Sequence, residues 1–586
     1  MVDLRIYRAA FVFALLAAVV CMFSLESRPP ALSSTLAPDA FDDRGATDTM
    51  REIVARHPDR RAGTSGDAAT ANVVRSRLDG LGFETSRDEF GADVDGERAS
   101  LVNVTGVLSG PSEKQLVVLA HRDAARRGGV ASAAATATLL ELARALAAAR
   151  HELTLVFVSL DAGEAGGAGA RRFADRYESR GDVEAALVLD DIAAARANRP
   201  YVVPWSTNGL RSSLQLLRTI EAALGRELGA GARAAHPLGQ FVQQAWPLTL
   251  RDQGPLVSAG MDAATLTARG ELPRPPAEDV AADFSRLRLA RSGKAALASV
   301  LALDAARRLE RSPSGYLTLG RQVLPRWSVA LLALGFLIPV FVAALDAFAR
   351  TRRRAQPAGR WLQWALALSV PFLIVVVAAK LFELVGWLPG SATEALAPAT
   401  RPRFAEVAPP LGALAVLFAL GLLVARRVVG ARELRPPASG AAVTLALLLS
   451  VEVLVLWLGN PFAALLLLPV VHLCLLMALP DGTNRRALVL AAVASALLLP
   501  AVVLVYYGAQ LDLGVDVTRY LLLVLAGQDS LWAGMLGSLI AGSLVATIVI
   551  ALTRPGRARE AEITIRGPST YAGPGSLGGT RSALRR

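Results

Sequence analysis

Eight long apolar stretches constrain the fold of this chain more than any other feature of its sequence. One lies near the N-terminus, and seven follow residue 326. As a helix, each is long enough to cross about 30 Å of hydrocarbon. We therefore expect a polytopic membrane protein with eight spans. The stretches are 9–25, 327–349, 361–387, 409–425, 438–458, 461–480, 487–508 and 530–553.

Arginines alternate between the two sets of loops that join these stretches. One set, together with the C-terminal tail, is rich in arginine, and the opposite set holds three. Because Lys and Arg concentrate in cytoplasmic loops, both termini are expected in the cytoplasm. The net charge of +12 has the same origin and does not indicate nucleic-acid binding. The arginine-rich segments are 350–360, 426–437, 481–486 and 554–586, and the isolated arginines are Arg401, Arg403 and Arg519.

The ends of the apolar stretches divide the chain into segments. The first stretch follows Arg5 and Arg8 and has no small-residue cleavage site directly after it, which favours an uncleaved signal anchor. The Ala- and Arg-rich composition favours a bacterial cell membrane. The predicted segments are a cytoplasmic N-terminus 1–8, the anchor 9–25, a linker 26–46, an extracytoplasmic domain 47–310, a connector 311–326, a seven-span domain 327–553 and a basic, disordered cytoplasmic tail 554–586.

Between residues 47 and 310 the pattern changes to that of a soluble α/β domain. Short β-rich runs, such as LVVLAH, LTLVFVSLD and AALVLDD, alternate with segments rich in Ala, Leu and Arg that are typical of helices. The expected fold class is an α/β domain whose central sheet is flanked by helices, followed by an all-α polytopic membrane domain.

Residues 48–270 resemble the di-zinc aminopeptidase family that includes aminopeptidase Y and bacterial leucyl aminopeptidases. The segments that carry the resemblance follow the family's order, and the spans downstream are similar to its membrane-embedded branch, the ER metallopeptidase and vacuolar membrane protease type. The resemblance implies a zinc-exopeptidase-like fold with a mixed sheet. Its segments are HPDRRAGTSGDAATANVVRSRLDGLGFETSRDEF, LVNVTGVLSG, KQLVVLAHRD, LLELARAL, LTLVFVSLDAGEAGGAGARRFAD and AALVLDD.

The resemblance also implies a site with two zinc ions, and part of its ligand set is present. His121 and Asp190 match ligands of one zinc, and Glu164 matches a ligand of the other. Asp123 matches the aspartate that orients the histidine. The retained acidic residues could equally be helix caps or hydrogen-bond anchors.

Three further positions implied by the resemblance hold residues that cannot do the family's chemistry. The bridging aspartate's position is Ala131, the general base's is Gly163, and the last ligand's is Gln253, after Asp252. Two dications about 3.5 Å apart repel by roughly 19 kcal/mol at an effective dielectric near 20, and a bridging carboxylate offsets this repulsion. Loss of a general base alone typically costs about 10²–10⁴ in rate. Zinc is thus possible by family, but a two-metal centre is not expected.

Several neighbouring residues bear on this expectation. His236 is the one histidine placed to substitute for a lost ligand, although a surface loop role is the alternative. Asp191 is expected on the other side of its strand, in a solvated or capping role. Arg122, Arg126 and Arg127 either add positive charge beside the site or form a solvated loop.

The later apolar stretches contain the ionisable residues Lys380, Glu383, Glu452 and His472. Lys380 and Glu383 are one helical turn apart, which is compatible with local pairing. Glu452 and His472 lie on consecutive spans joined by a short turn, and whether they pair is open. Ionisable groups in spans suggest function, here a proton or substrate pathway.

Three functions remain open on the sequence alone. The first is a non-catalytic relative of the peptidases whose extracytoplasmic domain binds a peptide or protein ligand or serves assembly. The second is an active zinc aminopeptidase or metallopeptidase that uses displaced ligands. The third is a transporter, or a membrane protein that interacts with lipid, with an accessory domain. Membrane lipid is an expected partner in each case, and nucleic acid is not.

Overall fold

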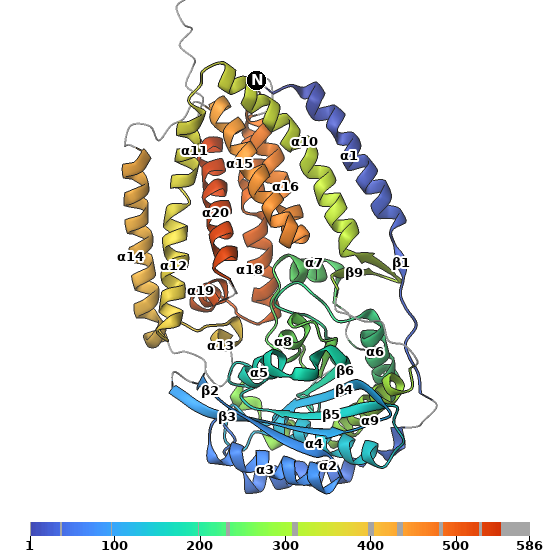
Figure 1. Ribbon diagram of the computed structural model, residues 1–586. Helices are drawn as coiled ribbons and strands as arrows, with labels where there is room; N and C mark the ends of the chain where they lie inside the picture. The colour runs from blue at the N-terminus through green and yellow to red at the C-terminus, as the bar shows by residue number, and fades with distance from the viewer. Residues whose placement is uncertain are drawn as a thin grey trace, which may run out of the picture.

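The computed structural model places a sheet domain at one end of the molecule and a helical domain at the other (Figure 1). The predicted tail 554–586 and most of the predicted loops 426–437 and 481–486 lie outside the described residues. The structure describes residues 2–34, 38–94, 97–196, 199–229, 232, 235–272, 274–306, 314–396, 404–429, 438–479, 485–526 and 530–552.

A seven-stranded mixed sheet forms the centre of the sheet domain, and this confirms the predicted fold class. Its inner strands β5, β4, β6 and β8 run parallel, and the outer strands β2, β3 and β7 run antiparallel to their neighbours. Parallel strands are joined by crossovers, which bring helices to both faces. In spatial order the strands are β2 (Glu84–Val94), β3 (Glu97–Leu108), β5 (Leu153–Leu160), β4 (Ser112–His121), β6 (Val183–Asp190), β8 (Ala263–Thr267) and β7 (Tyr201–Val203).

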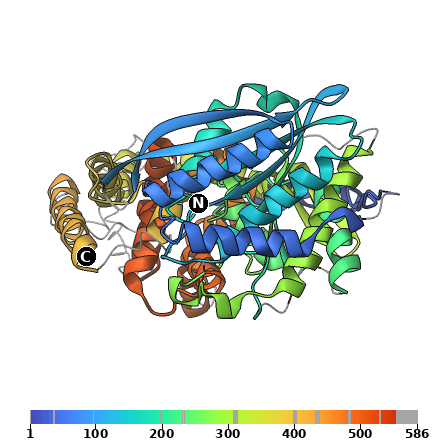
Figure 2. The same ribbon diagram turned by 90° about the horizontal axis from the view of Figure 1, so that it is seen from below.

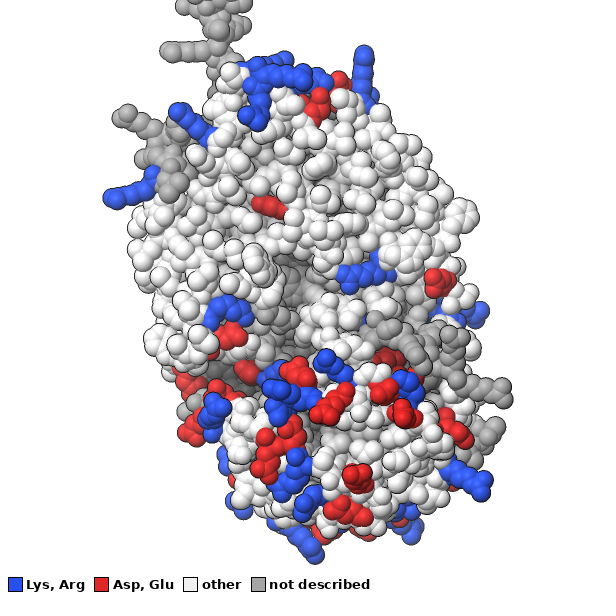
Figure 3. All heavy atoms as spheres, in the orientation of Figure 1, with Lys and Arg blue, Asp and Glu red and all other residues white. Residues whose placement is uncertain are grey.

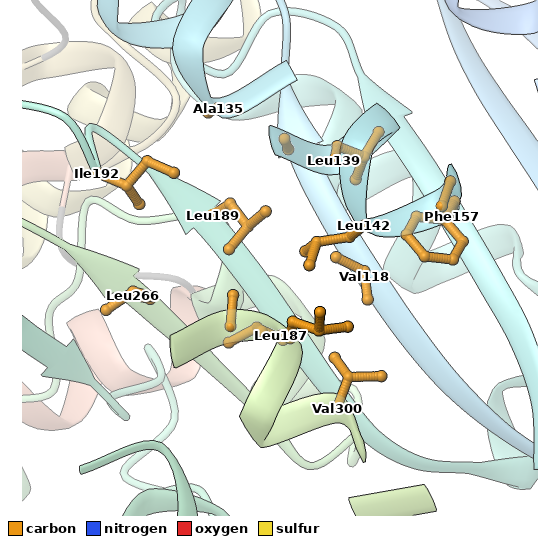
Figure 4. Packing of buried hydrophobic residues seen from close by; sticks show 14 of the residues in the cluster. Val118, Ala135, Leu139, Leu142, Phe157, Leu187, Leu189, Ile192, Leu266 and Val300 are labelled. Carbon is orange, nitrogen blue, oxygen red and sulfur yellow. The ribbon is translucent and has the colours of Figure 1, made fainter. Parts of the chain in front are cut away.

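Alternate residues of the central strand β4 face two different helix layers. Val118 and Ala120 pack into the larger apolar core with α2, α3, α4, α6 and α9, where Val118 lies near Leu142 (Figure 4). Val117 and Leu119 pack against α5 and α8. The view in Figure 2 shows α2 and α3 crossing the face turned away from the helical domain. The helices are α2 (Asp43–Arg56), α3 (Ser65–Gly80), α4 (Ala131–Ala147), α5 (Ala168–Arg176), α6 (Leu214–Leu228), α8 (Gln253–Ser258) and α9 (Arg286–Asp304).

The helical domain has fewer clear membrane spans than the eight predicted. Within the described part of the chain, six helices are long and apolar enough to cross a membrane, or up to seven if a pair bent by 49° counts as one span. That pair corresponds to the predicted span 487–508, and the predicted span 461–480 forms a helix of only 16 residues. The helices are α1 (Leu4–Phe23), α10 (Arg326–Arg353), α11 (Ala358–Ala367), α12 (Val370–Leu384), α14 (Phe404–Val429), α15 (Ala438–Gly459), α16 (Pro461–Leu476), α17 (Arg485–Ala496), α18 (Leu498–Gln510), α19 (Val517–Ala526) and α20 (Leu531–Leu552).

Parts of the predicted linker and connector pair with each other. Strand β1 (Glu26–Ser27) runs antiparallel to β10 (Gln322–Pro325), which also pairs with β9 (Tyr316–Leu319). Helix α1 packs along α10, where a Cβ at Gly335 would lie 2.6 Å from Ala17 Cβ. The chain therefore leaves and re-enters the helical domain at adjacent positions (Figure 1).

The two domains meet through α7 (Pro237–Ala245) of the sheet domain. The Tyr507 hydroxyl on α18 donates to Gln243 Oε1 at 2.8 Å, and Asn460 Nδ2 donates to the carbonyl oxygens of Gln244 and Ala245, both at 3.0 Å. Val242 shares an apolar cluster with helices of the helical domain. Charged side chains gather on the sheet domain and at the far end of the helical domain, and the band between them has few (Figure 3).

Candidate functional site

The candidate site lies at the carboxyl edge of the parallel strands. His121 is the last residue of β4, Asp190 is the last residue of β6, and Glu164 lies in the turn after β5. Because parallel strands end at the same edge of a sheet, these residues from distant parts of the sequence come together. His121 Nε2 lies 3.7 Å from Glu164 Oε1 and 3.9 Å from Asp190 Oδ1. The three retained positions thus share one buried cluster.

His121 is held by a residue to which the sequence analysis gave no role. Its Nδ1 lies 3.1 Å from Asp252 Oδ2, whereas its Nε2 is buried and has no hydrogen-bond partner among the described residues. Burial lowers the pKa of His121, but its hydrogen bond with Asp252 and the nearby Glu164 and Asp190 carboxylates raise it well above its usual value. The imidazole therefore lies among three acidic side chains, which favour its protonated form.

Asp190 has a second cationic partner, Arg251, which the sequence analysis missed. The Arg251 Nη1 forms an ion pair with Asp190 Oδ2. Its Nε donates to Gly270 O and its Nη2 to Leu272 O, both at 2.7 Å. Burial lowers the pKa of Arg251, but the neighbouring carboxylates, Asp190 most of all, outweigh this effect. The pKa of Arg251 therefore lies above its usual value. In the sequence, the signal for this role is an arginine directly before Asp252, in the segment expected to carry the last histidine ligand.

Asp123 does not orient His121 as predicted. Its two carboxylate oxygens accept from the backbone N–H groups of Gly163, at 2.7 Å, and Glu164, at 3.0 Å. Burial raises the pKa of Asp123 to about 7, although the nearby His121 lowers it. The Asp123 carboxylate binds the turn after β5, and Asp252 instead bonds with the His121 ring.

The position predicted for a bridging aspartate lies at the start of a helix. Ala131 is the first residue of α4, and the N–H groups of Ala131 and Val130 donate to Asp279 Oδ1 at 2.9 and 2.7 Å. A carboxylate therefore does reach this position from elsewhere in the chain. It satisfies the free N–H groups of the helix, as a capping residue does.

The other two substituted positions are Gln253 and Gly163, and both are held by contacts with neighbouring residues. Gln253 accepts from Thr265 Oγ1 at 2.6 Å and donates to Trp205 O and Thr249 Oγ1, both at 2.9 Å. A Cβ at Gly163 would lie 2.4 Å from the Cβ and Cγ atoms of His121. A side chain at position 163 therefore requires that the His121 ring move.

Arg122 and Asp191 do not have the roles predicted for them, and His236 lies outside the cluster. Arg122 is completely buried and bonds with Asp67 at 2.6 Å and Asp161 at 2.9 Å, so it neither faces the site nor is solvated. Asp191, predicted to be solvated or a cap, is buried and paired with Arg274. His236 is exposed and caps α7, so it does not substitute for a ligand. Arg126 and Arg127 lie in the surface loop before α4.

A short helix of the helical domain lies against the turn that carries Glu164. This helix, α13 (Ala392–Leu396), follows α12 and was not predicted. Its Glu394 Oε1 lies 3.0 Å from Arg171 Nη2. A Cβ at Gly167 would lie 3.8 Å from Thr393 Cγ2 and 3.6 Å from Asp252 Oδ1. Gly167 therefore lies between α13 of the helical domain and Asp252 of the buried cluster.

The donor set of this cluster does not fit a pair of zinc ions. Across the described ranges, no group of three His, Cys, Asp or Glu side chains is arranged to hold a metal ion. The Arg251 guanidinium occupies one oxygen of Asp190, and Gln253 has its amide oxygen and nitrogen engaged elsewhere. A catalytic zinc usually has three protein ligands.

The ionisable residues of the helical domain do not form one group. Lys380 Nζ lies 2.7 Å from Glu383 Oε2, so these two pair locally. His472 bonds through Nδ1 with the Tyr7 hydroxyl at 2.7 Å and through Nε2 with Phe336 O at 3.0 Å. Glu452 accepts from Ser543 Oγ instead, so the possible pairing of Glu452 with His472 is not formed.

The family match lies within the sheet domain. Residues 103–275 match the family described as peptidase family M28. No curated protein matches the chain. The solved zinc aminopeptidase from Bacillus subtilis is 14% identical with a TM-score of 0.36, and the match covers 44% of this chain and 94% of that one.

Two other solved structures give similar values. For an Acidobacteriales bacterium glutaminyl cyclase the identity is 19% and the TM-score 0.37, with coverage of 48% of this chain and 99% of that one. For an aminopeptidase from Aneurinibacillus sp. strain AM-1 the identity is 11% and the TM-score 0.36, with coverage of 47% and 97%. Residues 103–275 are therefore similar to peptidase family M28, and they lie in a mixed α/β sheet domain that is joined to a region of apolar helices.

Proposed function

We propose that this chain is an integral membrane protein whose M28 domain does not catalyse two-zinc hydrolysis and serves binding or assembly. The observation that carries this proposal is the ion pair between Arg251 and Asp190. The guanidinium supplies the positive charge that a zinc ion would supply at that carboxylate. A dication beside this guanidinium, whose side chain is 11% exposed, is disfavoured by charge repulsion.

The contacts of the M28 domain support an assembly role. The face with α5, α7 and α8 is turned toward the helical domain, and Val242 and Leu248 share an apolar cluster with its helices. The ion pair between Arg171 and Glu394 lies beside the Glu164 turn. We propose that the former substrate side of the domain now packs on membrane helices, at the outer surface of a bacterial cell membrane, and that any peptide or protein ligand binds beside this junction.

The test uses the full chain purified in detergent. Zinc per chain is measured by mass spectrometry, and aminopeptidase activity is measured with fluorogenic aminoacyl substrates. We expect less than one zinc per chain and no activity that a chelator removes. Two zinc ions per chain, with activity lost both on chelation and in His121→Ala, would establish the alternative, an active metallopeptidase. His236→Ala is the matched control, because this exposed histidine lies outside the cluster.

A further inference from the structure

Among the described residues of the helical domain, one buried carboxyl group, that of Glu452, has no cation paired with it. Glu452 lies on α15 and is 4% exposed. Its Oε1 accepts a hydrogen bond from Ser543 Oγ on α20 at 2.9 Å. Its Oε2 is buried and has no hydrogen-bond partner among the described residues. An ionised carboxylate in this place would keep one hydrogen bond and lose most of its hydration.

The position of Glu452 along its helix is inside the apolar part of the domain. It lies seven residues before the end of α15 at Gly459, which is about 10 Å at 1.5 Å per residue. Its neighbours Leu449 and Val453 belong to the apolar core formed by α10, α11, α15, α16 and α20. Solvent therefore does not replace the missing partners.

Two helices packed against α15 offer no counter-ion to Glu452. Helix α20 has no titratable side chain. On α16, His472 bonds with Tyr7 and Phe336, and Cys474 Sγ points to the Ala442 carbonyl oxygen. These two titratable groups of α16 are thus engaged away from Glu452.

The charged residues of the other two neighbours lie at different depths. Trp457 Nε1 donates to Ala330 O, which places Glu452 level with residues near 335 of α10. Asp346 is then about 16 Å further along α10, and Arg326 about 13 Å in the other direction. On α11, Arg360 is next to Trp361, which packs on Gly440, about 18 Å along α15 from Glu452.

We propose that Glu452 is a proton-binding site of the helical domain, protonated at neutral pH, with Ser543 as its hydrogen-bond donor. A proton neutralises the carboxylate with no further ligand, whereas metal cations such as Ca²⁺ or Mg²⁺ need several oxygen ligands. Buried acidic residues of this kind carry protons in pumps and transporters. The proposal is independent of the role of the M28 domain, and it gives the transporter hypothesis a concrete chemical group.

The test is infrared spectroscopy of the full chain in lipid vesicles at neutral pH. A protonated carboxylic acid has a C=O stretching band separate from the carboxylate bands, and this band shifts in D₂O. In the difference spectrum of wild type minus Glu452→Gln, we expect one such band. Glu383→Gln is the matched control: its carboxylate pairs with Lys380, so its difference spectrum should show carboxylate bands and no acid band.

A second variant and a second condition complete the test. Ser543→Ala removes the donor and should shift the Glu452 band without removing it. Raising the pH should convert the band to carboxylate bands. The proposal is overturned if the difference spectrum at neutral pH shows only carboxylate bands for Glu452. It is also overturned if sodium, potassium or calcium salts at constant ionic strength remove the acid band, which would indicate a cation site.

Discussion

Asp190 in the sheet domain and Glu452 in the helical domain are equally buried, each 4% exposed, but their surroundings differ. Asp190 lies beside the Arg251 guanidinium, a cation, and the His121 imidazole. Glu452 has one neutral donor, Ser543. Removing an ion from water costs several kcal/mol even after relaxation, so each carboxyl group needs compensation. Equal burial therefore leads to a fixed ion pair where a cation is near, and to a proposed bound proton where none is.

The largest effect is expected from removing the cation of the first site. Arg251→Ala leaves Asp190 buried beside Glu164 with one balancing cation fewer, so unfolding free energy should fall by about 3–5 kcal/mol. Chemical or thermal unfolding of the purified chain, followed by circular dichroism, measures this. The double variant Asp190→Asn, Arg251→Ala should recover part of the loss. A loss under about 1 kcal/mol for Arg251→Ala would show that the pair does not balance the site.

The next effect concerns the fit of Gly163 against His121. Gly163→Ala places a Cβ 2.4 Å from the imidazole, and overpacking of this kind typically costs about 1–3 kcal/mol. The same unfolding measurement applies. Gly181→Ala is the matched control: nothing lies within 4 Å of its Cβ, and like Gly163 it has no positive φ. A loss for Gly163→Ala no larger than that for Gly181→Ala would mean that contact with His121 contributes nothing.

A smaller effect is expected at the second site. Glu452→Gln keeps an acceptor for Ser543 and replaces one neutral group by another, so stability should change by less than about 1 kcal/mol. This is the sharpest contrast with Arg251→Ala. If Glu452 were ionised and balanced by an unseen cation, Glu452→Gln would leave that cation unpaired and destabilise the chain by several kcal/mol.

The smallest effect concerns the ion pair that joins α13 to the M28 domain. Arg171 and Glu394 are partly exposed, so Glu394→Ala should cost only about 0.2–1 kcal/mol. It should also speed hydrogen exchange of the amides in the turn around Glu164, measured by mass spectrometry. Asp88→Ala, which breaks the neighbouring pair with Arg172, should leave that turn unchanged. Unchanged exchange of that turn in Glu394→Ala would show that α13 does not restrain it.

The sheet domain could be predicted because its sequence patterns are local. Apolar strand runs separated by amphipathic helices specify alternating β and α elements, and strand ends bring distant residues to one edge. The clustering of His121, Glu164 and Asp190 follows from this rule. Arg251 was missed because nothing in a linear pattern shows which side chain enters a cluster when a ligand is lost.

In the helical domain, the pattern of apolar residues does not predict where each helix ends or bends. Apolar length suggested a span at 461–480, yet the helix ends at Leu476 after 16 residues, and the stretch 487–508 is bent at Leu497. Hydropathy records composition and not the breaks that packing introduces. The partner of Glu452 is likewise invisible in sequence, because Ser543 lies 91 residues further on.

The pairing of β1 with β10 has a consequence for how this molecule tolerates cleavage. Both connections to the M28 domain lie side by side, and α1 remains packed along α10 independently of them. A single proteolytic cut between residues 28 and 34 would leave two fragments that stay associated and comigrate until denatured. Release of the M28 domain into solution would require a second cut, near the start of α10.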